Sequence, residues 1–248
     1  MRSMNRILLS ILLVFTICAL QAQEVKKVLC IGNSFTYYHD SYKILAELAL
    51  SQGYKLDVNA QFVGGYTFHR HLNRDETMAT ITYNKFDYVF LQDQSQTPAL
   101  LGLSPKRCRL FLEDVKELAE RVRAYSPNAK IWVEQTWSYS QGNYGGFGSY
   151  ENFDNCLRKG AKLMAKKAHA NVSPIGEAFI LCRAEKPEID LYDQDRKHQS
   201  FYGSYLKSCI NYLLIFGKPF TSSASSCGHD EVTCAQLRAI AERVVLNK

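Results

Sequence analysis

The sequence lacks several patterns that mark common classes of protein. No two cysteines form a C-x-x-C pair, which argues against a structural zinc site. The loop after the first expected strand has neither a Gly-x-Gly-x-x-Gly nor a Walker pattern. Their absence disfavours a nucleotide or phosphate binder. Basic residues are scattered among acidic ones, so no stripe for nucleic acid is present. The longest apolar run covers residues 7–20, which is too short to span a bilayer.

The first 23 residues have the pattern of a secretory signal peptide. A cationic start at Arg2 and Arg6 precedes the apolar run of residues 7–20, and residues 21–23 form a short polar exit. Cleavage after Ala22 would lower the formal charge from +6 to +4. We therefore expect an exported protein, periplasmic or secreted, with no stable membrane span after cleavage.

The cysteines leave two questions open. Cys18 would suit an acylated lipoprotein, although the bulky Ile17 before it disfavours that alternative. An oxidising compartment permits disulfides, and the odd number of cysteines after cleavage leaves at least one thiol free. Cys227 and Cys234 flank a polar loop and are the expected disulfide pair.

Strand and helix patterns alternate along the rest of the chain. Short apolar runs predict strands at residues 27–31, 56–63, 88–91, 131–134 and 172–175. Helical patterns begin at Asp40, a plausible N-cap, and cover residues 105–124, 150–168, 203–216 and 230–246. This alternation predicts one α/β domain over residues 24–248, a three-layer α/β/α sandwich with a central parallel five-stranded sheet.

In such sheets the functional site lies beyond the carboxyl ends of the strands. The first predicted strand ends in Gly32-Asn33-Ser34, which places a serine hydroxyl at a strand-to-helix turn. A nucleophile needs this exposure, with backbone N–H groups aimed at its developing oxyanion. Taken alone, the tripeptide is also an ordinary turn sequence.

A second pattern, Asp195-x-x-His198, lies near the other end of the domain. An Asp three residues before a His can receive the Nδ1 proton and leave Nε2 to take a proton from the serine. Asp193 and Asp190 compete for this orienting role, and His39 is a rival base. An exposed, inert histidine is the simpler alternative.

Together these blocks resemble the SGNH or GDSL hydrolases. Gly32-Asn33-Ser34 is similar to their nucleophile block, and Asp195-x-x-His198 is similar to their terminal DxxH block. Gly64-Gly65 resembles the glycine block, and Gln92-Asp93-Gln94-Ser95 falls where the family has GxND. The resemblance spans residues 28–206. It fits a divergent branch of exported SGNH proteins, many of which are similar to glycan-directed esterases of Bacteroidetes. It implies the flavodoxin-like fold of these enzymes.

The sequence departs from the family pattern at three positions. Asn33 replaces the usual Asp beside the nucleophile, and Gln199 stands where Pro commonly follows the His. Gln94, or less favourably Gln92, must replace the oxyanion-hole Asn. Loss of one oxyanion donor costs about 2.7 to 4 kcal/mol, so a misplaced Gln would give a slow enzyme.

The resemblance implies a serine esterase with Ser34, Asp195 and His198 as its catalytic triad. The oxyanion would be held by backbone N–H groups of Ser34 and of Gly64 or Gly65, together with the Gln94 amide. The implied substrate is a small acyl ester, such as an O-acetyl group on a carbohydrate, and no metal or organic cofactor is implied. The alternatives are a non-catalytic carbohydrate-binding relative and a flavodoxin-like cofactor or phosphate binder, the latter disfavoured by the missing glycine pattern.

Further residues are candidates for substrate contact. Residues 138–149 form a loop rich in Gly, Ser and Tyr, which would help bind a substrate or simply connect two elements. Trp137, Tyr139 and Tyr144 are expected to stack on a sugar ring, whereas Trp132 is expected in the core. Asn33 and His71 are further candidate contacts. The alternation of His69 with His71 suggests a metal site only weakly, because no acid stands at matching spacing.

Overall fold

A computed structural model describes residues 24–141 and 146–247 of the chain. The predicted signal peptide and Tyr144 lie outside these residues. The central sheet has five strands, which are all parallel and stand in the order β2-β1-β3-β4-β5. They are β1 (Lys26–Gly32), β2 (Leu56–Phe62), β3 (Tyr88–Leu91), β4 (Lys130–Glu134) and β5 (Asn171–Ser173). The predicted parallel five-stranded sheet is confirmed.

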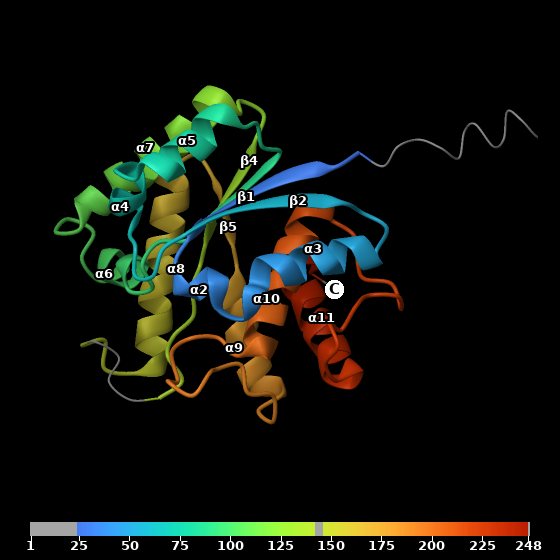
Figure 1. Ribbon diagram of the computed structural model, residues 1–248. Helices are drawn as coiled ribbons and strands as arrows, with labels where there is room; N and C mark the ends of the chain where they lie inside the picture. The colour runs from blue at the N-terminus through green and yellow to red at the C-terminus, as the bar shows by residue number, and fades with distance from the viewer. Residues whose placement is uncertain (1–23, 142–145, 248) are drawn as a thin grey trace, which may run out of the picture.

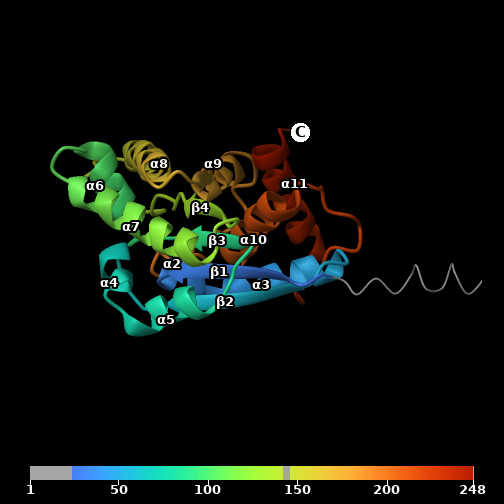
Figure 2. The ribbon, with the colours of Figure 1, turned by 90° about the horizontal axis from the view of Figure 1, so that it is seen from above.

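Helices cover both faces of this sheet, as Figures 1 and 2 show. They are α2 (Ser34–Tyr37), a 3₁₀ turn η1 (Tyr38–Asp40), α3 (Ser41–Ser51), α4 (Phe68–Leu72), α5 (Asp75–Tyr83), α6 (Thr97–Leu103), α7 (Arg109–Tyr125), α8 (Tyr150–Lys167), α9 (Ile175–Glu185), α10 (Phe201–Phe216) and α11 (Glu231–Leu246). In Figure 1, α3, α10 and α11 lie to one side of the sheet, and α4, α5 and α7 lie to the other. The three-layer architecture predicted from the sequence is confirmed.

The central strand β1 is buried on both of its faces. Leu29 and Ile31 pack into the core beneath α5 and α7, whereas Val28 and Cys30 pack into the core beneath α3 and α10. A strand covered on both sides needs a continuous apolar run instead of alternation. This is why the sequence of β1 reads as nearly unbroken apolar residues.

Side-chain caps set the first residues of the longer helices. Ser149 accepts a hydrogen bond from the N–H of Asn152 at the start of α8, and Ser200 accepts one from Gly203 at the start of α10. Asp40 precedes α3 as expected, but the predicted cap is wrong. Its backbone is left-handed, with φ of 52°, and its carboxylate pairs with Lys43 instead of the helix N–H groups.

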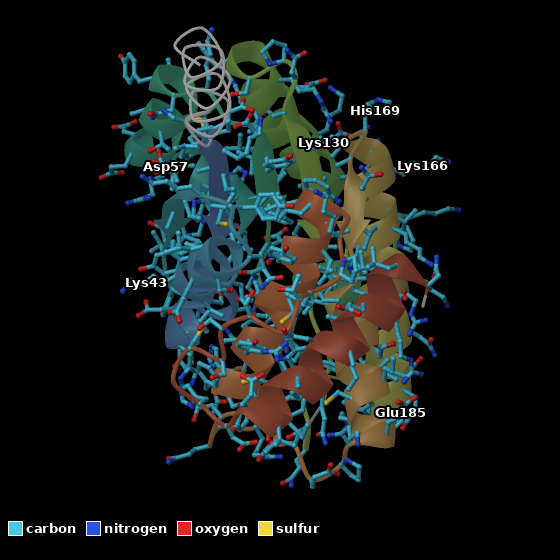
Figure 3. All side chains as sticks on the ribbon, turned by 90° about the vertical axis from the view of Figure 1, so that its right-hand side faces the viewer. Lys43, Asp57, Lys130, Lys166, His169 and Glu185 are labelled. Carbon is cyan, nitrogen blue, oxygen red and sulfur yellow. The ribbon has the colours of Figure 1, made fainter. Side chains whose placement is uncertain are left out.

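The carboxyl ends of the strands are aligned along one edge of the sheet. Gly32 pairs with Phe62, Ile31 with Leu91, and Glu134 with Ser173. In Figure 3, Lys130 at the start of β4 lies toward one end of the molecule, and Glu185 at the end of α9 lies toward the other. Segments that follow the strands therefore meet at one end, where the chain can assemble a site.

Two further expectations concern the chain as a whole. Cys227 and Cys234 are both free thiols, so the predicted disulfide is not formed in this structure. Within the described residues, none of the helices combines the length and apolar character needed to cross a bilayer.

Candidate active site

Ser34 is the first residue of the one-turn helix α2, directly after β1 (Figure 1). Asn33 caps this turn, because its side-chain oxygen accepts a hydrogen bond from the N–H of Phe35. The N–H of Ser34 stands at a helix start, where a backbone donor has no partner within the helix. The hydroxyl and a free backbone donor are thus presented together at the edge of the sheet.

The residues Ser34, His198 and Asp195 form one chain of hydrogen bonds. The Oγ of Ser34 lies 2.7 Å from Nε2 of His198, and Nδ1 of His198 lies 2.5 Å from Oδ2 of Asp195. The second carboxylate oxygen of Asp195 accepts the backbone N–H groups of Lys197 and His198, both at 2.9 Å. Desolvation raises the pKa of the Asp195 carboxyl, but these hydrogen bonds outweigh it and leave the pKa below its ordinary value. A carboxylate so held fixes both the tautomer and the orientation of the imidazole.

The rival residues occupy other positions. The carboxylate of Asp190 pairs with Arg196 at 2.6 Å, and that of Asp193 lies 3.3 Å from Nε2 of His39. Neither acid reaches His198, and His39 faces Asp193. The sequence therefore left open a choice that the geometry resolves in favour of Asp195 as the neighbour of His198.

Aromatic rings hold the imidazole of His198 from two sides. Tyr38 stacks on it with ring centroids 4.2 Å apart and an interplanar angle of 10°, and Phe35 lies against it at 5.1 Å. Trp137 lies beneath Phe35 and donates its indole N–H to the carbonyl of Lys197. The loop of residues 190–200, named the His198 loop, is therefore anchored by ring packing as well as by hydrogen bonds.

A cavity of about 200 Å³ opens beside the serine and the histidine. Its lining residues are Asn33, Ser34, Phe35, Gly65, Gln94, Ser95, Tyr139, Lys197 and His198. Gly65 has a φ of 68°, a left-handed conformation that favours glycine, and its exposed backbone faces the cavity. Gly64 is absent from the lining and packs near the hydroxyl of Tyr37 instead.

The two glutamines that compete for the oxyanion role differ in position. Gln92 is 1% exposed, and its side-chain oxygen accepts the N–H of Asn33 and the hydroxyl of Thr36. It therefore supports the nucleophile turn from below. Gln94 lines the cavity, but its side-chain oxygen accepts the N–H of Gln96 and its amide nitrogen lies 3.4 Å from the hydroxyl of Ser95. Of the two, only Gln94 is placed where it could turn toward a bound oxyanion.

Asn33 ties the nucleophile turn to its neighbouring loops. Its amide nitrogen donates to the carbonyls of Tyr66 at 2.9 Å and Asp93 at 3.3 Å. The side chain is 2% exposed and its polar atoms are occupied by the protein. The prediction of Asn33 as a substrate contact is therefore wrong for its side chain, because the amide organises the site from within.

His71 is also part of the scaffold, so its predicted contact with substrate is wrong. The ring is fully buried and its Nε2 lies 3.0 Å from the carbonyl of Gly32. Since a carbonyl only accepts, Nε2 carries the proton and Nδ1 accepts from the hydroxyl of Thr77 at 3.1 Å. Burial lowers the pKa of His71 to about 4, so the ring stays neutral.

Asp93 lies buried between the segments that carry Gly65 and Gln94. One of its carboxylate oxygens accepts the N–H of Phe68 at 3.0 Å and that of Gln94 at 2.7 Å. Burial raises the pKa of Asp93 to about 7 despite these two bonds. The carboxylate therefore ties the segment that follows Gly65 to the segment that carries Gln94.

A buried ion pair supports the nucleophile turn from α10. The ammonium of Lys207 lies 2.5 Å from Glu134 and donates to the carbonyl of Phe35 and the hydroxyl of Thr36, both at 3.0 Å. Both side chains are at most 2% exposed. The other oxygen of Glu134 accepts the amide of Asn211 at 2.9 Å. All three ammonium protons thus have partners, two of which belong to α2.

The aromatic candidates divide between the cavity and the core. Tyr139 lines the cavity, where its hydroxyl lies 3.0 Å from that of Ser95. Trp137 is 1% exposed and stacked between Phe35 and Phe179, so its predicted contact with a sugar ring is wrong. Trp132 stacks on Phe90 within the core, as expected.

The weakly suggested metal site is not supported by the geometry. His69 is exposed and its ring nitrogen lies 3.1 Å from Asp114, while His71 is buried elsewhere. Across residues 24–141 and 146–247, no group of three or more His, Cys, Asp or Glu side chains is arranged to hold a metal ion.

Several residues of the site had no clear signal in the sequence. Tyr38 reads as an ordinary loop residue. Asp93 stands in the block that falls where the family has GxND, but that resemblance gives it no role of its own. Lys207 did have a signal, because it interrupts a strongly apolar stretch of α10. A lysine in such a position must find buried acceptors.

The sequence matches no protein-family model and no curated protein. Solved structures do match it. A DUF4886 family protein from Bacteroides uniformis superposes with a TM-score of 0.71 at 20% identity, over 90% of this chain and 95% of that chain. A putative GDSL-like lipase from Parabacteroides merdae gives 0.60 at 14% identity, over 79% and 98%.

An acetylxylan esterase, Axe2 from Geobacillus stearothermophilus, gives a TM-score of 0.55 at 15% identity, over 81% of this chain and 97% of that chain. At these identities the likeness shows the fold. The predicted resemblance to the SGNH or GDSL hydrolases is confirmed at that level.

Proposed function

We propose that this protein is an exported serine esterase that removes a small acyl group, such as O-acetyl, from a carbohydrate. The observation that carries the proposal is the single hydrogen-bonded chain from Ser34 through His198 to Asp195. A serine at a strand-to-helix turn, a histidine with Nε2 facing it and a carboxylate on Nδ1 are what acyl transfer requires.

In the proposed reaction, Nε2 of His198 takes the proton of Ser34 as Oγ bonds to the ester carbonyl carbon. The carbonyl π electrons move to its oxygen. When this intermediate collapses, the bond from carbon to the alcohol oxygen breaks and the imidazolium gives its proton to that oxygen. Water then attacks the acyl-enzyme, its proton passes by way of His198 to the Ser34 oxygen, and the acyl group leaves as a carboxylic acid.

The developing oxyanion would be held by the backbone N–H groups of Ser34 and Gly65. Gln94 would complete this set if its amide turned away from Ser95 when substrate binds. Its present bonds to Gln96 and Ser95 favour a slow enzyme over a fast one. They are also the one observation that favours the second candidate function, a carbohydrate-binding protein with weak or no hydrolysis.

The small acyl group is supported by the size of the cavity. Its volume of about 200 Å³ suits an acetyl group with part of a sugar ring. Tyr139 lines this cavity and would be the aromatic contact for that ring. The acetylxylan esterase among the structures with this fold is consistent with an acetylated glycan as substrate.

Hydrolysis of p-nitrophenyl acetate tests the proposal. Wild-type protein should release p-nitrophenol, and Ser34→Ala should reduce the rate to that of buffer. Asp195→Asn should lower kcat by orders of magnitude, because the imidazole loses the acceptor that fixes its tautomer. Equal rates for wild type and Ser34→Ala would refute the esterase assignment and favour the binding protein.

A further inference from the structure

The charges around the His198 loop are unevenly paired. Each of its three acids has a partner: Asp190 pairs with Arg196, Asp193 with His39, and Asp195 with His198. Lys197 on the loop and Arg183 on α9 have no ion pair with any residue in the described part of the chain. Lys197 and Arg183 are therefore both available to pair with a negatively charged ligand.

Lys197 belongs to the cavity that holds Ser34. Among the described residues that line this cavity, it is the only lysine, arginine or acidic residue. Its ammonium lies 5.6 Å from the ring centroid of Tyr139. A cation over an aromatic face is held weakly enough to exchange for an anion. The ammonium of Lys197 thus lines this cavity without an ion-pair partner of its own.

Arg183 belongs to a second cavity of about 280 Å³, between α9 and the outer side of the His198 loop. Its guanidinium carbon lies 4.4 Å from the ring centroid of Tyr150 and 5.8 Å from that of Tyr192. This stacking orients the guanidinium and leaves its N–H groups free to bind a carboxylate in a bidentate manner. Ile189 and Leu191 contribute apolar lining to the same cavity.

The two cavities are joined by consecutive residues of the loop. Arg196 borders the second cavity and Lys197 borders the first. Ser140 fixes this junction, because its N–H donates to the carbonyl of Arg196 and its hydroxyl accepts from the guanidinium of Arg196 at 2.9 Å. The two cavities therefore border adjacent residues of one loop, so a single oligosaccharide is the ligand that would occupy both.

We propose that the cavity beside Arg183 is a subsite for a carboxylate-bearing sugar, so that the substrate is an ester of an acidic, uronic-acid-containing glycan. This rests on the proposed esterase function for the reaction, but the binding itself does not require turnover. The carboxylate of one uronic acid pairs with Arg183, and Lys197 favours a second negative charge near the scissile ester.

Isothermal titration calorimetry measures the binding of an unesterified oligogalacturonide of three residues to the Ser34→Ala protein. It should bind more tightly than xylotriose, and its affinity should fall as salt is added because the contact is between charges. Arg183→Gln should weaken binding about tenfold, equivalent to about 1.4 kcal/mol. Arg107→Gln, which removes an exposed arginine on the distant α6–α7 connection, serves as the matched control and should bind as the parent does.

Kinetics separate this inference from the esterase proposal. The ratio of kcat/KM for an acetylated oligogalacturonide to that for an acetylated xylo-oligosaccharide should exceed one, and both Lys197→Gln and Arg183→Gln should lower it. Turnover of both substrates with a ratio near one, and no binding of the oligogalacturonide, would overturn the acidic subsite and leave the esterase intact. The opposite result is a wild-type protein that turns over neither substrate but binds the oligogalacturonide in a salt-sensitive manner, with this binding lost in Arg183→Gln. That result would support the acidic subsite and overturn the esterase proposal.

Discussion

At the scale of single residues, the imidazole of His198 is held by four different neighbours. Asp195 and Ser34 bind its two nitrogens, and Tyr38 and Phe35 pack on its ring. A partly exposed ring on a loop would otherwise turn about its side-chain bonds. Stacking limits this freedom and keeps Nε2 directed at the serine hydroxyl.

Replacing Tyr38 tests the stacking contact. Tyr38→Ala should lower kcat for p-nitrophenyl acetate about tenfold, since an aromatic pair contributes roughly 0.5 to 1.5 kcal/mol. Tyr38→Phe keeps the ring and should retain most of the rate. Equal losses in the two variants would instead show that the hydroxyl of Tyr38, and not the stacking of its ring, supports catalysis.

Replacing Asp93 tests the effect of its burial on stability. The pKa of Asp93 is raised from 3.8 to about 7, so between these values the folded protein keeps a proton that the unfolded chain has lost. The free energy of unfolding therefore falls as pH rises through this window. Asp93→Asn removes the titration, and its stability relative to wild type should rise by up to about 4 kcal/mol between pH 4 and 7, at about 1.36 kcal/mol per pKa unit.

Urea unfolding of both proteins at pH 4, 5.5 and 7 measures this difference. A stability gap that stays constant over the three pH values would show that Asp93 does not titrate there. His71 contributes a pH dependence of opposite sign, because burial lowers its pKa from 6.5 to about 4. Comparing wild type with Asp93→Asn cancels that contribution.

The residues that the sequence could identify are those whose spacing is local. Asp195 and His198 stand three residues apart on one loop, so their pairing follows from the chain itself. Whether His71 or Trp137 faces solvent depends on segments far away in the sequence. A polar side chain gives no local sign that distant backbone groups will occupy it, which is why both were wrongly predicted as substrate contacts.

At the scale of elements, the one-turn helix α2 has too few internal hydrogen bonds to hold its own shape. Lys207 replaces them by donating to the carbonyl of Phe35 and the hydroxyl of Thr36 from below, and Glu134 holds the ammonium of Lys207 in place. A fully buried ion pair seldom adds net stability compared with apolar residues. We attribute its presence to the positioning of the nucleophile turn.

Single and double variants of this pair separate positioning from stability. Lys207→Met alone should cost about 3 to 5 kcal/mol, because it leaves the charge of Glu134 buried and unpaired. Adding Glu134→Leu should recover most of that stability in urea unfolding. The double variant should nevertheless hydrolyse p-nitrophenyl acetate about tenfold more slowly than wild type, a loss of about 1.4 kcal/mol. Recovery of both stability and rate would show that the pair has no positioning role.

Helices α6 and α8 pack backbone against backbone at Gly160. A Cβ added there would overlap the carbonyl of Pro98 in α6. Gly160→Ala should therefore lower the free energy of unfolding by about 1 to 3 kcal/mol despite the better helix propensity of alanine. Lys162→Ala, an exposed position on the same helix, should change it by less than about 0.5 kcal/mol. Similar values for the two variants in thermal or urea unfolding would mean that the helices can separate at little cost.

The sequence predicted long elements better than short ones. The helices α8, α10 and α11 have clear caps or apolar periodicity, and their bounds agree with expectation to within a few residues. The helices α4 and α6 are too short for their apolar residues to show the helical repeat of 3.6 residues, so the sequence did not predict them. Helix α9 was missed because the predicted fifth strand was extended to Ile175, where the helix begins.

At the scale of the whole molecule, the site exists because one edge of the sheet collects distant segments. Ser34 follows β1, Gly65 follows β2, Gln94 follows β3, and Tyr139 follows β4. The His198 loop arrives from the connection between α9 and α10 to close the group. The alternation of strands and helices predicted this edge, because parallel strands place all their carboxyl ends together.

This edge of the sheet is proposed to activate one serine, Ser34. Incubation with a fluorophosphonate probe followed by peptide mass spectrometry measures it most directly, because only an activated hydroxyl displaces the fluoride. We expect a single adduct on Ser34 in wild type and much slower formation of this adduct in His198→Gln. Folded wild-type protein without an adduct on Ser34, or labelled equally fast in His198→Gln, would contradict it.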